Sequence, residues 1–301
     1  MNVPDEIVLT PGDERYPALL GVIPSPPRLR VRGSLEPSDG LAVAIVGSRR
    51  STPYGAEVAE ALAADLAARG VTIVSGLARG IDAAAHRGAL HGGGRTLAVL
   101  GSGIDVVYPP ENRDLRQAIE RQGAVISQFP NGTAPLPFNF PLRNRTIAGL
   151  ALGVVVVEAS ERSGALITAG LAGDLGREVF AVPGRVTSEV SRGPHGLLRD
   201  GAILVRDWAD VVQELPEPWR RAVQAPAAGS VETERTVTGT EAMVLAALKP
   251  DEPLHIEELT ALVALTPGRL ASALVTLELE GRARQLEGQR WMAVPARSRR
   301  R

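Results

Sequence analysis

The feature that most constrains this chain is an alternation of short, mostly apolar segments with longer segments of helical character. The short segments lie at 41–46, 71–74, 95–100, 124–127, 154–157 and 178–182. The longer segments lie at 53–69, 81–90, 111–122, 145–152 and 165–175. Strands without a polar face that alternate with helices form a parallel sheet covered on both sides. The sequence therefore predicts a doubly wound α/β domain over 41–215.

The segments outside this domain have a different character. Residues 1–40 are rich in proline and lack periodicity, which predicts an extended lead-in. Residues 216–238 combine prolines with a short charged run, as is typical of a linker. Residues 239–295 contain three expected helices and then two short strands around Glu287-Gly288, an arrangement typical of a winged helix. Residues 296–301 form a basic tail.

Composition excludes several classes of site. The chain has no cysteine, so a disulfide, a thiolate zinc site, an iron–sulfur cluster and a cysteine nucleophile are all excluded. Leu248 precedes the only lysine, Lys249, so the chain carries no Walker A loop. The histidines form no metal-spaced pair, and the longest apolar run, 148–157, is too short to span a bilayer. We expect no cofactor, no metal and no membrane contact, and a cytoplasmic location.

Catalytic signals are equally weak. No Gly-x-Ser-x-Gly elbow is present. Asp82 begins an expected helix, where it is as readily a partner of the helix dipole as a catalytic acid. His86 lies among alanines on that helix, where a packing role is favoured over metal ligation. We therefore expect no catalytic residue and no enzymatic activity.

Glycine, serine and arginine follow the expected strands at the points where these end. In an open parallel sheet, ligands bind outside the carboxyl ends of the strands. Glycine and serine before a helix leave backbone N–H groups free for an anion, although a single such turn is explained as well by space for a tight connection. Several such turns with interleaved arginines favour phosphate. The arginines at this edge are Arg49, Arg50, Arg79, Arg113, Arg143, Arg145 and Arg162.

The aromatic residues narrow the choice of ligand. Tyr54, Tyr108, Phe129, Phe138 and Phe140 lie in or beside the same loops. Bases stack on aromatic rings while arginine neutralises the backbone, which favours single-stranded nucleic acid, although loop anchoring is an equal alternative for each ring. A dinucleotide is disfavoured, because the fingerprint that begins at Gly101-Ser102-Gly103 has Val106 in place of its third glycine.

The expected winged helix is acidic. Residues 239–295 contain eight acidic and five basic residues, and the third helix carries Glu278 and Glu280 beside Arg269. A module that reads duplex DNA is normally basic on that face. We therefore favour a protein-contact module, with a duplex-binding transcription factor as the alternative.

Five motifs resemble, in order, those of the DprA/Smf family of DNA-processing proteins. They are Val-Ala-Ile-Val-Gly-Ser-Arg at 43–49, Ser-Gly-Leu-Ala-Arg-Gly-Ile-Asp at 75–82, Gly-Ser-Gly-Ile-Asp at 101–105 with Tyr-Pro-Pro-Glu-Asn-Arg at 108–113, Phe-Pro-Leu-Arg-Asn-Arg at 140–145, and Ser-Gly-Ala-Leu-Ile-Thr at 163–168. The resemblance implies a Rossmann-like fold, binding and protection of single-stranded DNA in natural transformation, and loading of the RecA recombinase. It also implies a homodimer, with single-strand-binding protein as a further candidate partner.

The resemblance also suggests which residues contact DNA. It carries the family's DNA-contacting arginine onto Arg49, and Arg113 is the nearest match to a basic residue after the third strand. The predicted contact set is Gly47, Ser48, Arg49, Arg50, Arg79, Arg113, Phe140, Arg143, Asn144, Arg145, Ser163 and Gly164. Many members carry an N-terminal helical domain, which we expect to be absent because only about 40 residues precede the first expected strand.

The alternative is an enzyme acting on nucleoside monophosphates. The expected fold resembles that of the cytokinin-activating phosphoribohydrolases, which carry a glycine-rich loop followed closely by a catalytic glutamate. Residues 163–171 contain no acidic residue, although Glu158 and Glu161 lie just upstream. The sequence therefore disfavours this activity.

Overall fold

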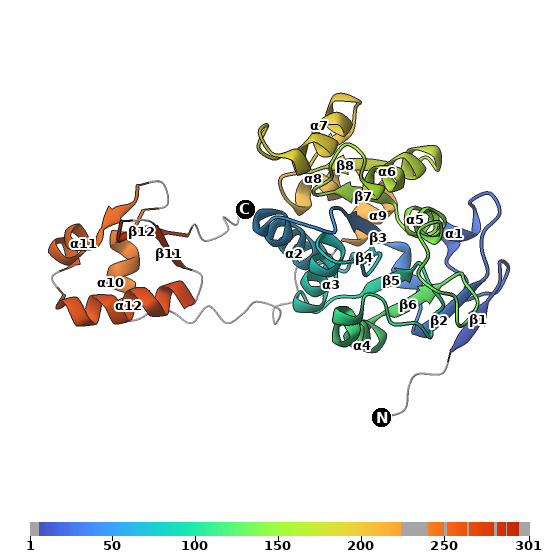
Figure 1. Ribbon diagram of the computed structural model, residues 1–301, viewed down its shortest axis with the longest axis horizontal. Helices are drawn as coiled ribbons and strands as arrows, with labels where there is room; N and C mark the ends of the chain where they lie inside the picture. Colours follow the sequence, from blue (N-terminus) through green and yellow to red (C-terminus); the bar gives the residue numbers. More distant parts are fainter. Residues whose placement is uncertain are drawn as a thin grey trace. The chain divides into compact units, whose positions relative to one another are not determined.

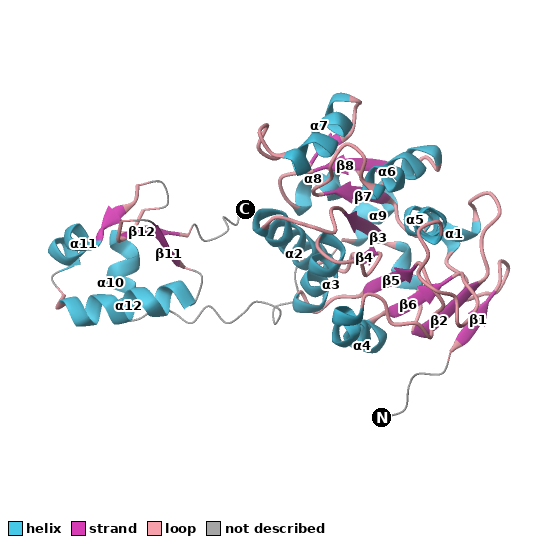
Figure 2. Cartoon of the chain, in the orientation of Figure 1, coloured by secondary structure: helices cyan, strands magenta, loops and turns pink. Residues whose placement is uncertain are grey.

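The computed structural model describes residues 6–223, 240–249, 252–263, 265–279, 282–286 and 288–294. These residues divide into two compact units, the first within 6–223 and the second within 240–294. Most of the expected linker and the expected basic tail lie outside the described residues. Figure 1 shows the chain coloured along its sequence, and Figure 2 shows its helices and strands.

A nine-stranded sheet forms the centre of the first unit, in the order β1-β2-β6-β5-β4-β3-β7-β8-β9. From β6 to β9 all neighbouring strands pair in parallel. This confirms the predicted doubly wound, mostly parallel α/β fold. These strands are β3 (Ala42–Val46), β4 (Thr72–Ser75), β5 (Thr96–Leu100), β6 (Ala124–Ser127), β7 (Gly153–Val156), β8 (Glu178–Ala181) and β9 (Ile203–Leu204).

Helices cover both faces of this sheet, as Figure 1 shows. One face packs against α1 (Ala18–Gly21), α5 (Asn139–Gly149), α6 (Gly164–Asp174) and α7 (Arg192–Arg199). The other face packs against α2 (Pro53–Ala67), α3 (Ile81–His91), α4 (Arg113–Gln122), α8 (Trp208–Gln213) and α9 (Glu217–Ala222). Burial on both faces explains why the central strands lack a polar side.

Residues 1–40 are not only an extended lead-in, and the sequence-based prediction is wrong in this respect. Strand β1 (Ile7–Leu9) pairs antiparallel with β2 (Leu29–Gly33), which pairs antiparallel with β6 and so extends the sheet. Alternate residues of the two strands, Leu9, Leu29 and Val31, are buried in the core. Each fully buried aliphatic side chain contributes about 1.5–3 kcal/mol, which offsets the cost of ordering this proline-rich segment.

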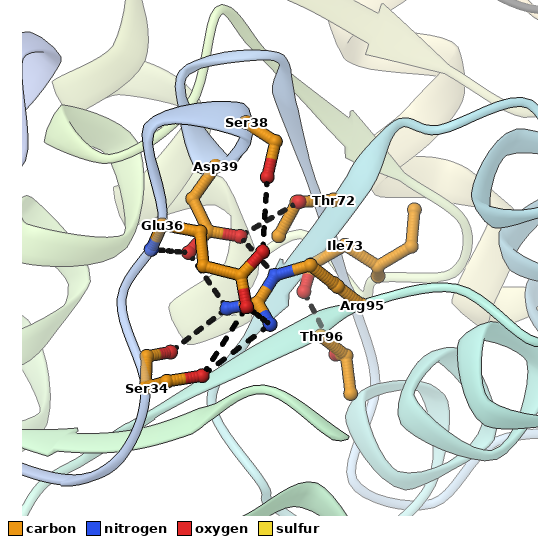
Figure 3. Close-up of polar contacts among 8 residues, drawn as sticks. All are labelled: Ser34, Glu36, Ser38, Asp39, Thr72, Ile73, Arg95 and Thr96. Atoms are coloured by element: carbon orange, nitrogen blue, oxygen red, sulfur yellow. Dashed lines mark hydrogen bonds and ion pairs between the residues drawn. The ribbon is translucent and has the colours of Figure 1, made fainter.

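A partly buried ion-pair cluster attaches the end of this segment to the sheet (Figure 3). The Arg95 guanidinium donates to both oxygens of Asp39 at 2.8 and 2.9 Å, to Glu36 at 2.7 Å and to the Ser34 carbonyl at 2.8 Å. Asp39 also accepts a hydrogen bond from the Thr72 hydroxyl at 2.9 Å. Because Arg95 precedes β5 and Thr72 begins β4, residues 34–39 are an integral part of the α/β unit.

The expected boundary at residue 216 is also wrong. Helix α9 lies within the predicted linker, yet Trp219 packs against the core and lies directly over Gly40. Before it, α8 contributes Trp208, whose ring lies 3.7 Å from the Arg69 guanidinium carbon. The α/β unit therefore extends through α9.

The second unit has the predicted winged-helix architecture. Its helices are α10 (Thr240–Ala247), α11 (Ile256–Val263) and α12 (Pro267–Leu279), and its sheet has the order β10-β12-β11. The sequence predicted the hairpin of β11 (Ala283–Leu286) and β12 (Arg290–Ala293), but not the two-residue strand β10 (Leu254–His255) that pairs with β12. Leu259, Leu270, Leu274 and Trp291 form the centre of its core.

In the described part of the chain, no single helix is long and apolar enough to cross a membrane. Two consecutive segments of the second unit, Ile256–Val263 and Gly268–Glu278, reach the necessary length and composition only when taken together, and they meet at an angle of 109°.

His86 is a buried, neutral histidine in α3. Its Nδ1 lies 2.7 Å from the Thr96 hydroxyl, which itself donates to the Ile73 carbonyl at 2.7 Å. Nδ1 must therefore carry the hydrogen, and Nε2 is buried without a hydrogen-bond partner. Burial, reinforced by the positive charges of Arg143 and Arg87, lowers the pKa of His86 to about 3.

We expect His86 to make the fold sensitive to acid. Below the ordinary pKa of 6.5, the unfolded chain binds a proton that the folded chain does not bind until about pH 3. As the pH decreases from 6.5 to about 3, the free energy of unfolding falls by up to about 1.4 kcal/mol per pH unit. Above this window the contribution of His86 to stability does not change with pH. Urea unfolding across this window should show a shallower pH dependence for His86→Asn, which keeps the donor and cannot titrate. Equal slopes for the two proteins would contradict this role.

Candidate nucleic-acid interface

A cleft of about 590 Å³ opens at the carboxyl ends of β3 and β7. These strands are neighbours in the sheet, but the chain continues from β3 to β4 on one side and from β7 to β8 on the other. Such a point, where the strand order reverses, leaves a crevice between the two outgoing loops. The cleft is lined by polar residues that include Ser48, Arg49, Arg50, Ser160 and Ser163, and by aromatic and apolar residues that include Tyr108, Pro135, Pro137, Phe140 and Ile167.

The loop after β3 presents two exposed arginines, Arg49 and Arg50. The Ser48 hydroxyl accepts a hydrogen bond from the Arg50 N–H at 3.1 Å, and the Ser48 carbonyl accepts one from the Ile81 N–H at 3.2 Å. A side chain at Gly47 would collide with Ile81, and one at Gly80, whose φ is +72°, would collide with the Ser48 carbonyl. Glycine is therefore required where this loop passes the start of α3.

Phe140 is the centre of a stacked group in the cleft. The Arg49 guanidinium carbon lies 4.5 Å from the centroid of the Phe140 ring, and that of Arg143 lies 5.7 Å from it. The Tyr108 ring is 6.2 Å away, tilted by 44°. Cation–π contacts of this kind contribute about 0.5–1 kcal/mol each when exposed and more when desolvated.

Helix α5 begins six residues before the predicted position, and this shift places Phe140 in its first turn. Pro141 lies in the same turn, where a helix has N–H groups without intrahelical partners, so a residue lacking an N–H is tolerated. The prolines within 135–141 predict a loop, and this is why the sequence places the helix start too late. Because the helix starts at Asn139, Phe140, Arg143 and Asn144 project from one rigid element.

Arg143 is buried beneath Phe140 rather than exposed to a ligand. Its guanidinium donates to the carbonyls of Gly76 at 2.6 Å and Val99 at 2.5 Å, so it joins the ends of β4 and β5. Burial lowers its pKa to about 10, which the nearby carboxylate of Asp82 opposes. The arginine remains charged at neutral pH, and its position indicates a role in supporting the site.

Asp82 is a buried acid that lines the cleft. Burial raises its pKa, an effect opposed by Arg143 and by the N–H groups of Ala78 and Gly76. The latter two lie 3.4 and 3.1 Å from its Oδ2. The carboxyl group is therefore engaged with the β4–α3 turn.

Two of the glycine turns at this edge, which together with the arginines favoured phosphate binding, are filled by protein side chains. A side chain at Gly76 would collide with Arg143 and Asp82, and one at Gly101 would collide with the Phe140 ring. Gly76, Gly101 and Ser102 are also buried. The prediction of phosphate-binding turns is therefore wrong for these two loops, where glycine makes room for the groups that support the cleft.

The start of α6 is open to the cleft. The Ser163 hydroxyl accepts a hydrogen bond from the Ala165 N–H at 3.3 Å, and the exposed Gly164 has no atom near the position of a side chain. Asn144 donates to the Gly164 carbonyl at 3.2 Å, which fixes this helix start against α5. The positive end of the α6 dipole thus faces the cleft.

Nine of the twelve predicted contact residues line the cleft, and Arg79, Arg113 and Arg145 do not. Arg79 is exposed and paired with Glu111, Arg113 is exposed at the start of α4, and Arg145 donates to the Pro24 carbonyl. The prediction omitted Tyr108, Ser160 and Ile167, which do line the cleft. The sequence could have indicated a role for Tyr108, because it is an aromatic residue beside an expected strand end. Ile167 gave no such indication, because it lies within an apolar helix.

Comparison with known proteins identifies the family. Residues 7–216 match DNA recombination-mediator protein A. The chain belongs to this family. Residues 225–289 match the DprA winged helix domain, in agreement with the second unit of the fold. The resemblance drawn from the five motifs is thereby confirmed.

Named relatives include Protein Smf of Escherichia coli, which is 45% identical over 69% of this chain and 56% of its own length. The chain thus matches little more than half of that relative. Protein Smf of Synechocystis is 36% identical over 94% of this chain and 79% of its own length. In the part of the chain that the structure describes, no three histidine, aspartate or glutamate residues gather as a metal site would require.

Two solved structures share the fold. That of DNA processing protein A from Streptococcus pneumoniae is 44% identical, with a TM-score of 0.67 over 70% of this chain and 74% of that one. The second is DNA processing protein A from Helicobacter pylori, described for its single-stranded DNA binding mode. It is 30% identical, with a TM-score of 0.63 over 70% of this chain and 95% of that one.

Proposed function

We propose that this protein binds single-stranded DNA in the cleft between β3 and β7. The observation that carries the proposal is the pair formed by Arg49 and Phe140, a cation stacked on an aromatic ring in a cleft lined by both polar and apolar side chains. A base that stacks on Phe140 takes the place of the guanidinium, which is then free to bind a backbone phosphate. Relatedness to the Helicobacter pylori protein supports this assignment.

The contact residues follow from this arrangement. Arg49, Arg50 and the α6 start at Ser163 and Gly164 bind phosphates, and Phe140 with Tyr108 stacks bases. Gly47, Ser48, Arg143 and Asn144 shape the site from below. Arg79, Arg113 and Arg145 lie outside the cleft and would contact only a strand long enough to extend beyond it.

The enzymatic alternative lacks a suitable acid in the described part of the cleft. Asp82 accepts hydrogen bonds from the backbone of its own turn, and the Glu158 carboxylate accepts two from Thr52. Residues 163–171 supply no carboxylate at the start of α6. A binding role without catalysis fits this site better than hydrolysis of nucleoside monophosphates.

We propose further that the bound strand is passed to a recombinase. A cytoplasmic protein of this family would protect incoming strands and load RecA during natural transformation, as a homodimer and with single-strand-binding protein as a second partner. The winged helix would serve protein contacts, because Glu257 and Glu258 are exposed on α11 while Arg269 is the only basic residue of α12. Support for these steps comes from family membership.

The decisive experiment is fluorescence anisotropy with a labelled poly-dT oligonucleotide and with its duplex across a salt series. Wild type should bind the single strand preferentially, and Arg49→Ala should weaken it about tenfold at low salt. The slope of log K against log salt should fall by about 0.7, because one phosphate is no longer neutralised by the protein. Arg121→Ala is the control, because Arg121 is exposed at the far end of α4, on the opposite edge of the sheet. Unchanged affinity for Arg49→Ala would contradict the proposed function.

A further inference from the structure

Both ends of the loop that carries Arg49 and Arg50 are attached to one residue, Glu158. At the entry, the Ser48 N–H donates to the Glu158 carbonyl at 2.7 Å. At the exit, the Thr52 N–H and hydroxyl donate to the two carboxylate oxygens at 2.9 and 2.5 Å. The main chain and the side chain of Glu158 thus span the segment from which both arginines project.

The Glu158 carboxylate is built into the fold. Its residue is only 3% exposed and follows β7, the strand that pairs with β3. The carboxylate lies at the start of α2, where the helix dipole and charge-assisted hydrogen bonds favour a negative charge. Thr52 transmits this attachment to the helix, because its hydroxyl also accepts the Gly55 N–H at 3.1 Å. A side chain at Gly55 would collide with the carboxylate, so this helix start leaves room for it.

We propose that Glu158 is a positioning residue, which holds Arg49 and Arg50 in the orientation that binds the DNA backbone. This inference rests on the proposed function. Two adjacent exposed arginines repel each other and carry long, freely rotating side chains, so an untethered loop would have to be ordered whenever a strand binds. Because both ends of the loop are attached to Glu158, the loop becomes ordered when the protein folds and does not have to be ordered again when a strand binds.

The sign of the charge makes the proposal testable. Glu158 is negative and lies beside a site for a polyanion, so its charge alone weakens binding. Removing that charge without changing the shape should strengthen binding if Glu158 acts only through electrostatics. If Glu158 positions the arginines, the same change should weaken binding. Direct electrostatics and positioning therefore predict opposite outcomes.

The test is Glu158→Gln in the full chain, with labelled poly-dT across a salt series. We expect binding to weaken about five- to tenfold and the salt dependence to become shallower, as when one phosphate is no longer bound by an arginine. Glu161→Gln is the matched control, because it removes an equal charge three residues away from an exposed side chain, and it should bind as well as wild type or better. In the Arg49→Ala background, Glu158→Gln should weaken binding less than it does in wild type, because only Arg50 is then left to be positioned.

A second pair of variants avoids dependence on the folding of Glu158→Gln. Thr52→Val removes the hydroxyl that reaches the carboxylate and should weaken binding, whereas Thr52→Ser keeps it and should restore binding. The proposal is overturned if Glu158→Gln and Thr52→Val, folded by circular dichroism, bind as tightly as wild type while Arg49→Ala binds weakly. If Arg49→Ala also binds as wild type does, the proposed function itself fails.

Discussion

Replacing Phe140 by alanine is expected to weaken the binding of single-stranded DNA about 5- to 150-fold. This is the effect of losing one base–aromatic stack, which contributes about 1–3 kcal/mol. The ring lines the cleft, and its nearest cation, Arg49, can move to a phosphate when a base replaces it. Anisotropy with labelled poly-dT measures the loss, and the salt dependence should stay close to that of wild type because no charge is removed.

Two further substitutions separate stacking from packing. Phe140→Tyr keeps the aromatic face and should bind nearly as wild type does. Phe140→Leu keeps most of the bulk that packs on Gly101 but has no π face, so it should bind almost as weakly as the alanine variant. Wild-type affinity in Phe140→Leu would show that the ring only fills space. Phe129→Ala, an aromatic that does not line the cleft, should leave affinity unchanged.

Replacing Arg143 by methionine is expected to lower the free energy of unfolding by about 3–5 kcal/mol, the usual effect of removing one partner from a buried charged group. The carbonyls of Gly76 and Val99 lose their donor, and the Asp82 carboxylate loses the nearest positive charge. Urea unfolding at neutral pH measures the change.

Arg145→Met is the matched control for this prediction. Arg145 lies two positions further along α5, is half-buried, and makes its hydrogen bond to the Pro24 carbonyl, so its loss should cost about 1 kcal/mol. Adding Asp82→Asn to Arg143→Met should recover part of the lost stability, because it removes the uncompensated charge. If Arg143→Met were as stable as Arg145→Met, the supporting role of Arg143 would have to be abandoned.

The pattern of apolar residues predicted the central strands correctly, because segments without a polar face must be buried on both sides. The residues of β3, β4 and β7 are buried on both faces, and an apolar segment of that length between helices fits only a parallel sheet. Strands β1 and β2 escaped prediction because prolines surround them, and because β6, the strand that joins β2 to the rest of the sheet, lies about 90 residues away. Local sequence carries no information about such a pairing.

The sequence predicted which edge of the sheet carries the site, but not which of the site residues are buried. Strand ends located Arg49, Phe140 and Arg143 at one edge of the sheet, where the structure indeed brings them together. The sequence could not distinguish Arg49, which is exposed, from Arg143, which is buried, because both are arginines that follow an expected strand. Arg143 is buried because Gly76, on a neighbouring loop, leaves room for its guanidinium.

The antiparallel pairing of β2 with β6 also bears on how the chain is made. Residues 29–33 leave the ribosome about 90 residues before 124–127, an interval of roughly 5–20 s at ordinary rates of synthesis. During that interval Leu29 and Val31 cannot be buried in the sheet, because β6 has not been made. Asp39 likewise lacks its ion-pair partner until Arg95 has been made. Pairing across so long a separation is intrinsically slow, and the pairing of β3 with β7 spans a longer one still, so the N-terminal strands should join the sheet well after they are made.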